Sequence, residues 1–195
     1  MLSYRVLTHI YVAAFVKNNR GASLGERPMF YGLPSIQLHP SSQLHIGNGV
    51  VLCSDANFTA LALNHRVKIS TVRKGACITV GNQVGMSGVC IVSASRISIG
   101  SDVLLGANVL IVDTDFHPVS PINRRHSDDV NVILSAPVNI GSNVFVGAGA
   151  VILKGVTVGD DSIIAAGAMV TAGEYPQGAI IAGNPARVVG SVYSR

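Results

Sequence analysis

A six-residue spacing of aliphatic residues constrains the fold of this chain more than any other feature. Aliphatic residues stand at intervals of six without a break at Ile140, Val146, Ile152, Val158, Ile164 and Val170. Glycine often follows the aliphatic residue, and a small residue often stands four positions after it, as Ala150 and Ala168 do. Glycine adopts turn conformations that residues with a Cβ adopt with difficulty. Each hexad therefore predicts a short strand followed by a tight turn.

The same phase extends toward the N-terminus, with more irregularity. Its aliphatic positions are Ile46, Leu52, Val80, Met86, Val92, Ile99, Leu105 and Ile111. We expect three hexads to close one triangular coil, with each aliphatic side chain pointing inward and stacking on its equivalent in the next coil. One coil cannot bury its own interior, so neighbouring coils must stack. The pattern predicts an all-β solenoid and not a β-sandwich, which needs alternation with a period of two, hairpin turns and more aromatic residues.

The composition fits a narrow interior filled by small aliphatic side chains. Hydrophobic residues make up 48% of the chain and aromatic residues 5%, Trp is absent, and 21 residues are Gly. Charged residues reach only 12%, too few to cover every face of a small monomer, so we expect faces buried against other subunits. The net charge of +4 fits a mildly basic surface or attraction to an anionic ligand or membrane. Without a dense Lys/Arg run interleaved with aromatics, nucleic acid is not an expected partner.

Two segments interrupt the repeat. Residues 57–75 carry no clean hexads and contain four basic residues, and residues 113–135 form a polar excursion between two regular stretches. Insertions in a solenoid map to loops on one face, often the binding face, so the second excursion is where we expect the chemistry. The predicted organisation is an N-terminal helical or extended segment (1–33), a β-helix with its loop (34–174) and a C-terminal tail that packs on the β-helix (175–195).

An apolar stretch over residues 4–16 predicts a helix near the N-terminus. One face of it would carry Tyr4, Leu7, Ile10, Tyr11 and Ala14. The stretch is too short to span a bilayer and lacks the cleavage site of a signal peptide. A helix docked on the protein is the first interpretation, and a helix on the surface of the inner membrane is the second. The cysteines Cys53, Cys77 and Cys90 form no CxxC pair and fit reduced thiols of a cytoplasmic protein.

The hexads, DTDFHP at 113–118 and AGNPARVV at 182–189 together carry a resemblance to a known family. The chain is similar to the hexapeptide-repeat acyltransferases over residues 40–190. Within that family it resembles the sugar O-acetyltransferases of polysaccharide clusters and the maltose and galactoside acetyltransferases. The resemblance implies a left-handed parallel β-helix, an exception to the usual right-handed crossover. It also implies a homotrimer with active sites between subunits, acetyl-CoA as co-substrate, and no metal.

The resemblance places the catalytic histidine in the loop after a hexad of the LGANVL type, where this chain has His117. A thioester is already activated, so the enzyme must deprotonate a poor nucleophile beside it, and imidazole suits this because its pKa lies near the working pH. Asp113 and Asp115 either cap the loop through backbone hydrogen bonds or orient the imidazole and the acceptor hydroxyls. Ser87 matches an acceptor-binding position of relatives or is a turn serine. Further candidates for the acceptor site are His65 and His126.

Coenzyme A is held mainly by main chain in this family. Small residues that admit pantetheine along the wall of the β-helix are Gly147, Ala148, Ala165, Ala166 and Gly167. The resemblance implies an oxyanion donor in a backbone N–H near Ala148. Arg187 is the best candidate for a CoA phosphate contact, since a guanidinium matches phosphate geometry, and Lys154 is a weaker one. The chain departs from the family at two cofactor positions: Phe145 stands where relatives often have Trp, and Thr171 precedes Ala where relatives often have Lys.

The resemblance, together with these features, implies an acetyl-CoA-dependent O-acetyltransferase that acts on a sugar hydroxyl in surface polysaccharide synthesis. Transfer is expected to be direct, because no GxSxG elbow occurs and no cysteine has a base beside it in sequence. The alternative on the same fold is an N-acetyltransferase of an amino sugar or antibiotic. A γ-type zinc carbonic anhydrase needs three converging His ligands, and His117 and His126 lack the close spacing of that family. The DTDFHP motif argues against a non-catalytic scaffold.

Overall fold

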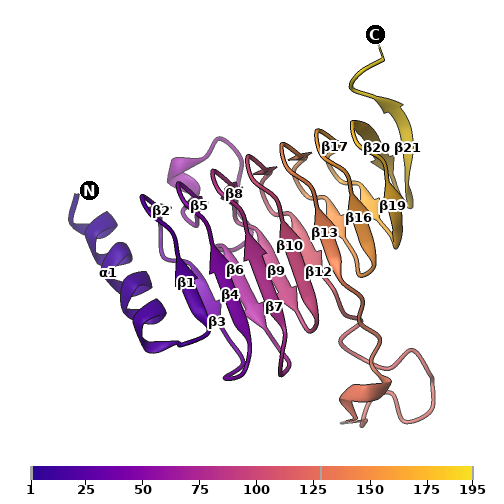
Figure 1. The fold of residues 1–195 in the computed structure, drawn as a ribbon, viewed down its shortest axis with the longest axis horizontal. Helices are drawn as coiled ribbons and strands as arrows, with labels where there is room; N and C mark the ends of the chain where they lie inside the picture. Colours follow the sequence, from indigo (N-terminus) through magenta and orange to yellow (C-terminus); the bar gives the residue numbers. More distant parts are fainter. Residues whose placement is uncertain (1, 128, 195) are drawn as a thin grey trace.

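Three parallel sheets, one for each hexad of a coil, surround a narrow apolar interior (Figure 1). The computed structural model describes residues 2–127 and 129–194. Successive strands enter the three sheets in turn, so the chain winds as a parallel β-helix. The all-β solenoid that the hexads predict and the left-handed β-helix that the resemblance implies are confirmed.

The sheets are named A, B and C in the order in which the chain enters them. Sheet A contains β1 (Ala22–Leu24), β4 (Gln43–Ile46), β7 (Cys77–Val80), β10 (Arg96–Ile99), β13 (Val138–Ile140), β16 (Val156–Val158) and β19 (Gly173–Tyr175). Sheet B contains β2 (Met29–Tyr31), β5 (Val51–Cys53), β8 (Gly85–Ser87), β11 (Leu104–Leu105), β14 (Phe145–Val146), β17 (Ile163–Ile164), β20 (Ala179–Gly183) and β21 (Ala186–Ser191). Sheet C contains β3 (Ser35–Gln37), β6 (Lys68–Thr71), β9 (Cys90–Ser93), β12 (Leu110–Val112), β15 (Val151–Ile152) and β18 (Met169–Val170). The helices are α1 (Leu2–Asn18), η1 (Ala56–Phe58) and η2 (Val130–Val132).

The repeat positions face the interior, as predicted. The register aligns Ile99 with Ile140 and Ile140 with Val158 in sheet A, and Val146 with Ile164 in sheet B. None of these five side chains is more than 3% exposed. Equivalent aliphatic residues therefore stack coil upon coil, and burying each such side chain contributes ~1.5–3 kcal/mol.

Stacked glycines build the turn from sheet A to sheet B, which we call the A–B corner. In successive coils this position is occupied by Gly47, Gly81, Gly100, Gly141 and Gly159. A Cβ on Gly100 would lie 2.6 Å from the carbonyl carbon of Gly141, closer than side chains approach a backbone. Side chains support the same turns: the amide oxygen of Asn82 accepts the N–H of Asn48 at 2.8 Å. Backbone packed directly on backbone thus sets the spacing of coils at this corner.

Gly100→Ala should lower the stability of the protein by ~1–3 kcal/mol, because the new methyl group has to displace the backbone of the next coil. The matched control is Gly190→Ala in β21, where the added Cβ would meet only Ile180 Cδ1 at 3.7 Å. We expect the control to change stability by less than ~0.5 kcal/mol. Urea unfolding of both variants measures the difference. Equal midpoints for Gly100→Ala and the unchanged protein would contradict the tight backbone stacking.

Both ends of the β-helix are covered. α1 lies against the first coil, where it buries Val12 and places the ring of His9 edge-on to Phe30, with 5.0 Å between centroids (Figure 1). At the other end β21 pairs antiparallel with β20. Beyond β21 the Tyr193 hydroxyl donates to Asp161 at 2.6 Å, and this hydrogen bond is the main cause that lowers the pKa of Asp161 to about 2. Covered ends leave fewer open strand edges for other chains to pair with.

The apolar side chains that the sequence places on one face of α1 point away from the β-helix, and α1 docks through Val12 instead. Leu7 is 63% exposed, Ile10 59% and Tyr11 43%, while the side chain of Tyr4 lies outside the described part. Within residues 2–127 and 129–194, no helix combines the length and the hydropathy that crossing a bilayer requires.

The strands extend beyond the segment boundaries expected from the hexads. β1 and β2, which precede residue 34, already pair in parallel with β4 and β5. The interruption at residues 57–75 is shorter than expected, because β6 lies between β3 and β9 in sheet C. At the C-terminal end β19 continues sheet A through Tyr175, and β20 continues sheet B. Several of these strands lack the aliphatic–Gly signature, and pairing with the neighbouring coil holds them in place.

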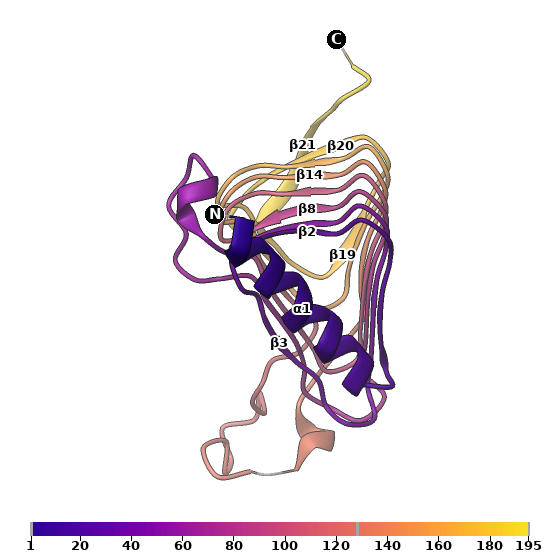
Figure 2. The ribbon, with the colours of Figure 1, turned by 90° about the vertical axis from the view of Figure 1, so that its left-hand side faces the viewer.

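Two long segments leave the β-helix at different corners (Figure 2). Residues 54–67 include η1 and connect sheet B to sheet C, at the B–C corner. Residues 113–137 include η2 and connect sheet C to sheet A, at the C–A corner. Viewed along the β-helix in Figure 2, the first segment projects to the left and the second projects downward. The excursion in which the sequence predicts chemistry is the one at the C–A corner.

Candidate active site

The excursion after β12 begins and ends as a two-stranded neck. Thr114 forms an antiparallel bridge with Ser135, and the N–H of Ala136 donates to the carbonyl of Asp113 at 3.0 Å. We call residues 116–133, beyond this neck, the C–A loop. Backbone hydrogen bonds hold both of its ends at the corner, so the loop projects away from the β-helix (Figure 1).

Asp113 anchors the neck to the coil beneath it. Its side chain is fully buried; Oδ1 accepts the N–H of Ala94 at 2.6 Å, and Oδ2 accepts the Ser93 hydroxyl at 2.6 Å and the N–H of Ser95 at 2.9 Å. Three bonds to a carboxylate offset the cost of burying it. This geometry matches the loop-capping interpretation. Both oxygens are engaged by the protein, so an acceptor could reach Asp113 only by displacing one of these bonds.

Asp115 forms an ion pair at the base of the C–A loop. Lys154, on the turn after β15, donates to Asp115 Oδ1 at 2.6 Å, and the two side chains are about one-quarter to one-third exposed. Lys154, considered above as a phosphate contact, is thus held by this carboxylate. The other oxygen, Oδ2, is buried and has no hydrogen-bond partner among the described residues. An unpaired buried oxygen is costly, so a donor brought to Oδ2 would be stabilising.

His117 is presented to solvent just beyond the neck. Its side chain is exposed, whereas the next residue, Pro118, is buried. The preceding residue, Phe116, has a φ of 61°, in the left-handed region that is unfavourable for a bulky side chain. The strained Phe116 on one side and the buried Pro118 on the other limit the directions in which the His117 side chain can point. The structure gives its imidazole no hydrogen-bond partner in the described part of the chain, which leaves the ring nitrogens available.

The small residues predicted to admit coenzyme A form a wall along the B–C corner. Gly147 and Ala148 follow β14, and the three residues from Ala165 to Gly167 follow β17 one coil later. A Cβ on Gly167 would meet nothing within 4 Å, so the wall is open toward solvent there. The N–H groups of Ala148 and Ala166 donate to no acceptor within the described residues. Both N–H groups thus lack an internal acceptor in the described chain.

The remaining predicted site residues lie in separate places. Ser87 is half-buried at the end of β8, at the same B–C corner. Phe145 points outward from sheet B and is 48% exposed. Arg187 is exposed on β21, and its guanidinium donates to the carbonyl of Ala186 at 2.8 Å. Thr171 follows β18 and lies at the C–A corner, apart from the other predicted cofactor residues.

Within one chain, the residues predicted to act together are divided between two corners. His117, Asp113 and Asp115 belong to the C–A corner, whereas Ser87 and the wall around Ala148 belong to the B–C corner (Figure 2). The two further histidine candidates are also at different corners, and both side chains are exposed. His65 lies on residues 54–67 at the B–C corner, and His126 lies on the C–A loop. Sheet C lies between the two corners. A single chain therefore does not unite the predicted base with the predicted CoA wall.

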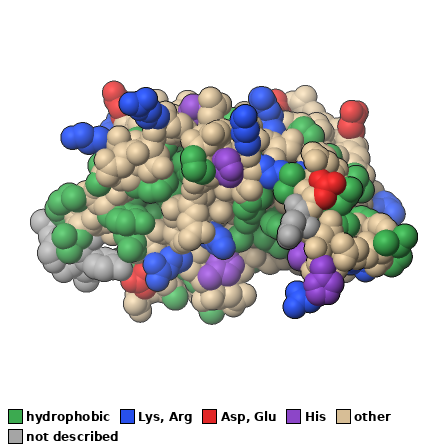
Figure 3. All heavy atoms as spheres, turned by 90° about the horizontal axis from the view of Figure 1, so that it is seen from below, with side chains coloured by type: hydrophobic (Ala, Val, Ile, Leu, Met, Phe, Trp, Pro, Cys, Tyr) green, Lys and Arg blue, Asp and Glu red, His purple; other side chains and the backbone are tan. Residues whose placement is uncertain are grey.

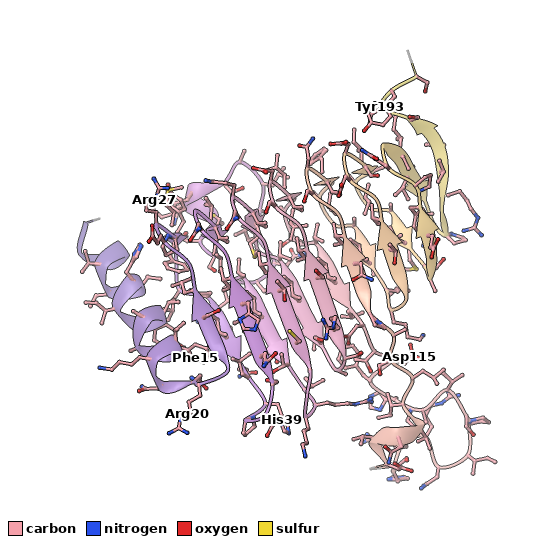
Figure 4. The ribbon with its side chains drawn as sticks, viewed as in Figure 1. Phe15, Arg20, Arg27, His39, Asp115 and Tyr193 are labelled. Atoms are coloured by element: carbon pink, nitrogen blue, oxygen red, sulfur yellow. The ribbon has the colours of Figure 1, made fainter. Side chains whose placement is uncertain are left out.

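A groove that the sequence did not predict runs beside the C–A loop. Its volume is about 660 Å³. Arg73 and Lys74, from the turn after β6, line one side, and Ile133 and Leu134 of the loop and neck line the other. His39 also lines the groove and is labelled at this corner in Figure 4. The basic residues were visible within the first interruption of the repeat, but nothing in the sequence pairs them with a segment some sixty residues away.

The three cysteines are free thiols. Cys53 and Cys77 are buried and Cys90 is half-buried. Burial raises the pKa of the Cys90 thiol, which disfavours the thiolate that a nucleophile requires. Within the described chain, the His, Cys, Asp and Glu side chains form no group of three that could hold a metal ion.

The repeat and the sequence match known proteins. Residues 96–113 and 137–172 match the family described as "Hexapeptide repeat of succinyl-transferase", and the gap between them coincides with the neck and the C–A loop. The chain is 38% identical to the galactoside O-acetyltransferase of Escherichia coli (strain K12) over 105 residues, which are 54% of this chain and 49% of that relative. It spans about half the length of the curated relatives it matches.

Solved structures share the fold over nearly the whole chain. A maltose O-acetyltransferase from Clostridium difficile 630 has a TM-score of 0.55 at 22% identity, over 99% of this chain and 88% of that one. A hexapeptide-repeat acetyltransferase from Vibrio cholerae O1 biovar eltor, solved with acetyl coenzyme A, has a TM-score of 0.54 at 18% identity, over 95% and 79%. At these identities the structures establish the fold alone. The hexads, the β-helix and the matched relatives together make the chain similar to the hexapeptide-repeat acyltransferases.

Proposed function

We propose that the protein transfers an acetyl group from acetyl-CoA to a sugar hydroxyl, with His117 as the general base. The observation that carries the proposal is an exposed imidazole on an anchored loop, with no hydrogen-bond partner among the described residues, in a chain similar to galactoside O-acetyltransferase. Acetyl-CoA supplies an activated thioester, which the acceptor hydroxyl attacks directly. The raised pKa of the half-buried Cys90 supports direct transfer over an acyl-enzyme on that thiol.

The residues of the C–A corner have distinct tasks in this proposal. His117 accepts the proton of the acceptor hydroxyl as its oxygen attacks, a role worth ~10² to 10⁴ in rate. The buried Oδ2 of Asp115, unpaired among the described residues, accepts a hydrogen bond from an acceptor hydroxyl or from the imidazole as the site closes around the ligand, while Lys154 holds the other oxygen. Asp113 acts through the loop, because its three hydrogen bonds keep the neck in place.

The wall at the B–C corner fits a pantetheine chain. Pantetheine carries amide carbonyls, and the N–H groups of Ala148 and Ala166 are unpaired within the described residues. The lack of a side chain at Gly167 leaves room for a ligand close to the backbone. In this proposal the N–H of Ala148 also stabilises the negative charge that develops on the thioester oxygen, because a preorganised backbone donor needs no reorganisation during reaction.

The proposal includes a homotrimer with each active site between two subunits. On the outer face of sheet B, Leu104 and Phe145 are 58% and 48% exposed and lie in register with Ile163. The outer row of sheet A is polar in contrast: Thr79, Ser98, Asn139 and Thr157. A monomer would leave the apolar row in water, and a closed ring buries it. The ring also provides a B–C wall from a neighbour for His117 to face.

An acetylation assay tests the function itself. The purified protein is given acetyl-CoA with neutral sugars, charged sugars and amino sugars, and thiol release and product mass are followed. O-acetylated products support the proposal, whereas products acetylated only on nitrogen favour an N-acetyltransferase. Loss of O-acetyl groups from the surface polysaccharide of a deletion strain tests the role in polysaccharide synthesis.

The proposed location is the cytoplasm, where free thiols such as those of Cys53 and Cys77 persist. Contact with the inner membrane through α1 is the second part of this proposal. The exposed side chains of Leu7, Ile10 and Tyr11 form an apolar face on a helix whose last turn is basic. Co-sedimentation with vesicles that contain anionic lipid tests that contact.

Arg187→Ala should weaken the binding of coenzyme A while barely changing that of dephospho-CoA. The proposed contact is between the guanidinium and the 3′-phosphate. Arg187 is exposed, and beyond its hydrogen bond to the carbonyl of Ala186 its other guanidinium N–H groups can donate to the phosphate. Calorimetry with both ligands measures the effect, expected at about tenfold for an exposed charge pair. Equal losses for the two ligands would place Arg187 away from that phosphate.

A further inference from the structure

The groove at the C–A corner is lined by three basic side chains and by no carboxylate of the described chain. Arg73 and Lys74 come from the turn after β6, and His39 comes from the turn after β3, one coil earlier. Seen from below in Figure 3, Lys, Arg and His side chains are spread over this face, with few carboxylates among them. A volume of about 660 Å³ lies within the range of small-molecule sites.

The positive charge in the groove has no counterion in the described part of the chain. The Arg73 guanidinium donates to Ser135 Oγ at 3.5 Å and to the carbonyl of Ile133 at 3.3 Å. Both acceptors are neutral and both bonds are long. No described carboxylate forms an ion pair with Arg73 or Lys74, since Asp115 at this corner is engaged by Lys154. A half-buried guanidinium with only long hydrogen bonds to neutral acceptors favours the binding of an anion, which it can hold with two parallel hydrogen bonds.

His39 adds a third donor. Its Nδ1 accepts the N–H of Ser41 at 3.3 Å, so the proton of the neutral imidazole lies on Nε2. The ring is half-buried at the edge of the groove. The groove therefore offers a guanidinium, an ammonium and an imidazole N–H, a set of donors that matches the oxygens of a phosphoryl or carboxylate group.

The groove leads toward the proposed base. A second cavity of about 210 Å³ shares Val72, Arg73 and Ile133 with it and reaches Thr114 and Phe116. Phe116 is the residue directly before His117. A ligand whose anionic group binds at Arg73 can therefore lie along the apolar side chains of Val72 and Ile133, with its other end beside the start of the C–A loop.

We infer that the acceptor is an anionic sugar, whose phosphoryl or carboxylate group is held by Arg73, Lys74 and His39 while a hydroxyl lies near His117. The identity of the ligand as the acceptor rests on the function proposed above. A neutral sugar leaves the cations of the groove unpaired and binds more weakly. The net charge of +4 also favours the approach of an anionic ligand.

Calorimetry at low ionic strength, where exposed charges are least screened, tests the site with three probes: glucose, glucose 6-phosphate and glucuronate. The anionic probes should bind at least tenfold more tightly than glucose, and their order distinguishes phosphoryl from carboxylate. Lys74→Gln should weaken the anionic probes about tenfold and leave glucose unchanged, because charge-assisted hydrogen bonds are lost. The matched control is Arg96→Gln, which removes an exposed charge from β10 in sheet A and should change nothing.

Arg73 needs a pair of variants because it also contacts the loop through Ser135 and Ile133. Arg73→Gln should lose the preference for anionic probes by about tenfold to a hundredfold. Arg73→Lys keeps the charge and should retain part of that preference. If both variants lose binding of all three probes equally, Arg73 acts only by holding the loop and the anion site is overturned.

Further outcomes separate this inference from the proposed function. Equal affinity for the three probes, or equal effects of Lys74→Gln and Arg96→Gln, would overturn the anion site. If neutral sugars are acetylated as efficiently as anionic ones, the transferase function stands and the inference about its acceptor falls. If the anionic probes bind in the groove but no sugar is acetylated, the transferase function falls, and the assignment of the groove to the acceptor falls with it.

Discussion

His117→Ala should lower kcat/KM for acetyl transfer at least ~10²-fold while the protein still binds acetyl-CoA. The imidazole is the proposed acceptor of the hydroxyl proton, and methyl has no lone pair to replace it. Binding should persist because the CoA wall around Ala148 and Ala166 belongs to a different corner of the β-helix. The His117 side chain is exposed and makes no hydrogen bond within the described chain, so its removal leaves the fold intact.

His45→Ala is the matched control for this loss. His45 is exposed on β4, in the outer face of sheet A, where its ring contacts Ser23 Oγ at 2.8 Å. Its removal deletes one imidazole far from the C–A corner, and kcat/KM should stay within about twofold, as for most exposed sites. Thiol-release kinetics and calorimetry with acetyl-CoA measure both variants. Near-full activity of His117→Ala in purified protein of the correct oligomeric state would remove His117 from the mechanism.

Mixing two inactive variants should restore activity if each active site is shared between subunits. One variant is His117→Ala, which lacks the base. The other is Ala166→Trp, which fills the proposed CoA groove with an indole ring at an exposed position of the B–C corner. After the two are unfolded and refolded together, mixed trimers contain junctions at which an intact His117 faces an intact wall. For equal mixing, one junction in four pairs an intact His117 with an intact wall, so activity should rise from near zero to roughly a quarter of the normal value.

Several results would contradict the shared site. No recovery, in mixed trimers confirmed by mass, means that the base and the wall act within one chain. A monomer at working concentration in light scattering defeats the trimer altogether. Ala166→Ser is the control for the tryptophan, since it adds only a hydroxyl at the same exposed position. That variant should remain active on its own.

The hexad pattern predicts the β-helix because its periodicity is local. Each aliphatic position, such as Ile140 or Val146, needs only its own hexad to define a strand and a turn, and the next coil repeats the arrangement. Pairing of Ile140 with Val158 and of Val146 with Ile164 follows from that repetition alone. The six-residue period of the sequence therefore specifies which strands of successive coils pair in the sheets. His117 is a prediction of a different kind, because it rests on the resemblance of DTDFHP to a family motif at the place where the repeat opens.

The sequence did not predict contacts between segments that lie outside the repeat. Arg73 meets Ile133 across the groove, and Asp113 binds the backbone of Ala94 in the coil beneath. No period or motif in the sequence indicates either pair. The contact of Arg73 with Ile133 depends on where the C–A loop projects, and the contact of Asp113 with Ala94 depends on which turn lies beneath the neck. The ion pair of Asp115 with Lys154 joins two turns that only coil stacking brings together.

By itself, the sequence determined the solenoid, the inward stacking of its aliphatic residues and the place where the repeat opens around His117. These are consequences of a six-residue period, and such a period can be satisfied only by coils that stack. The tertiary structure alone decided that His117 and the wall around Ala148 lie at different corners, and that Arg73 and Lys74 line a groove beside the C–A loop. Closure of the triangular coil is the physical reason, because it sets which turns face one another irrespective of their separation along the chain.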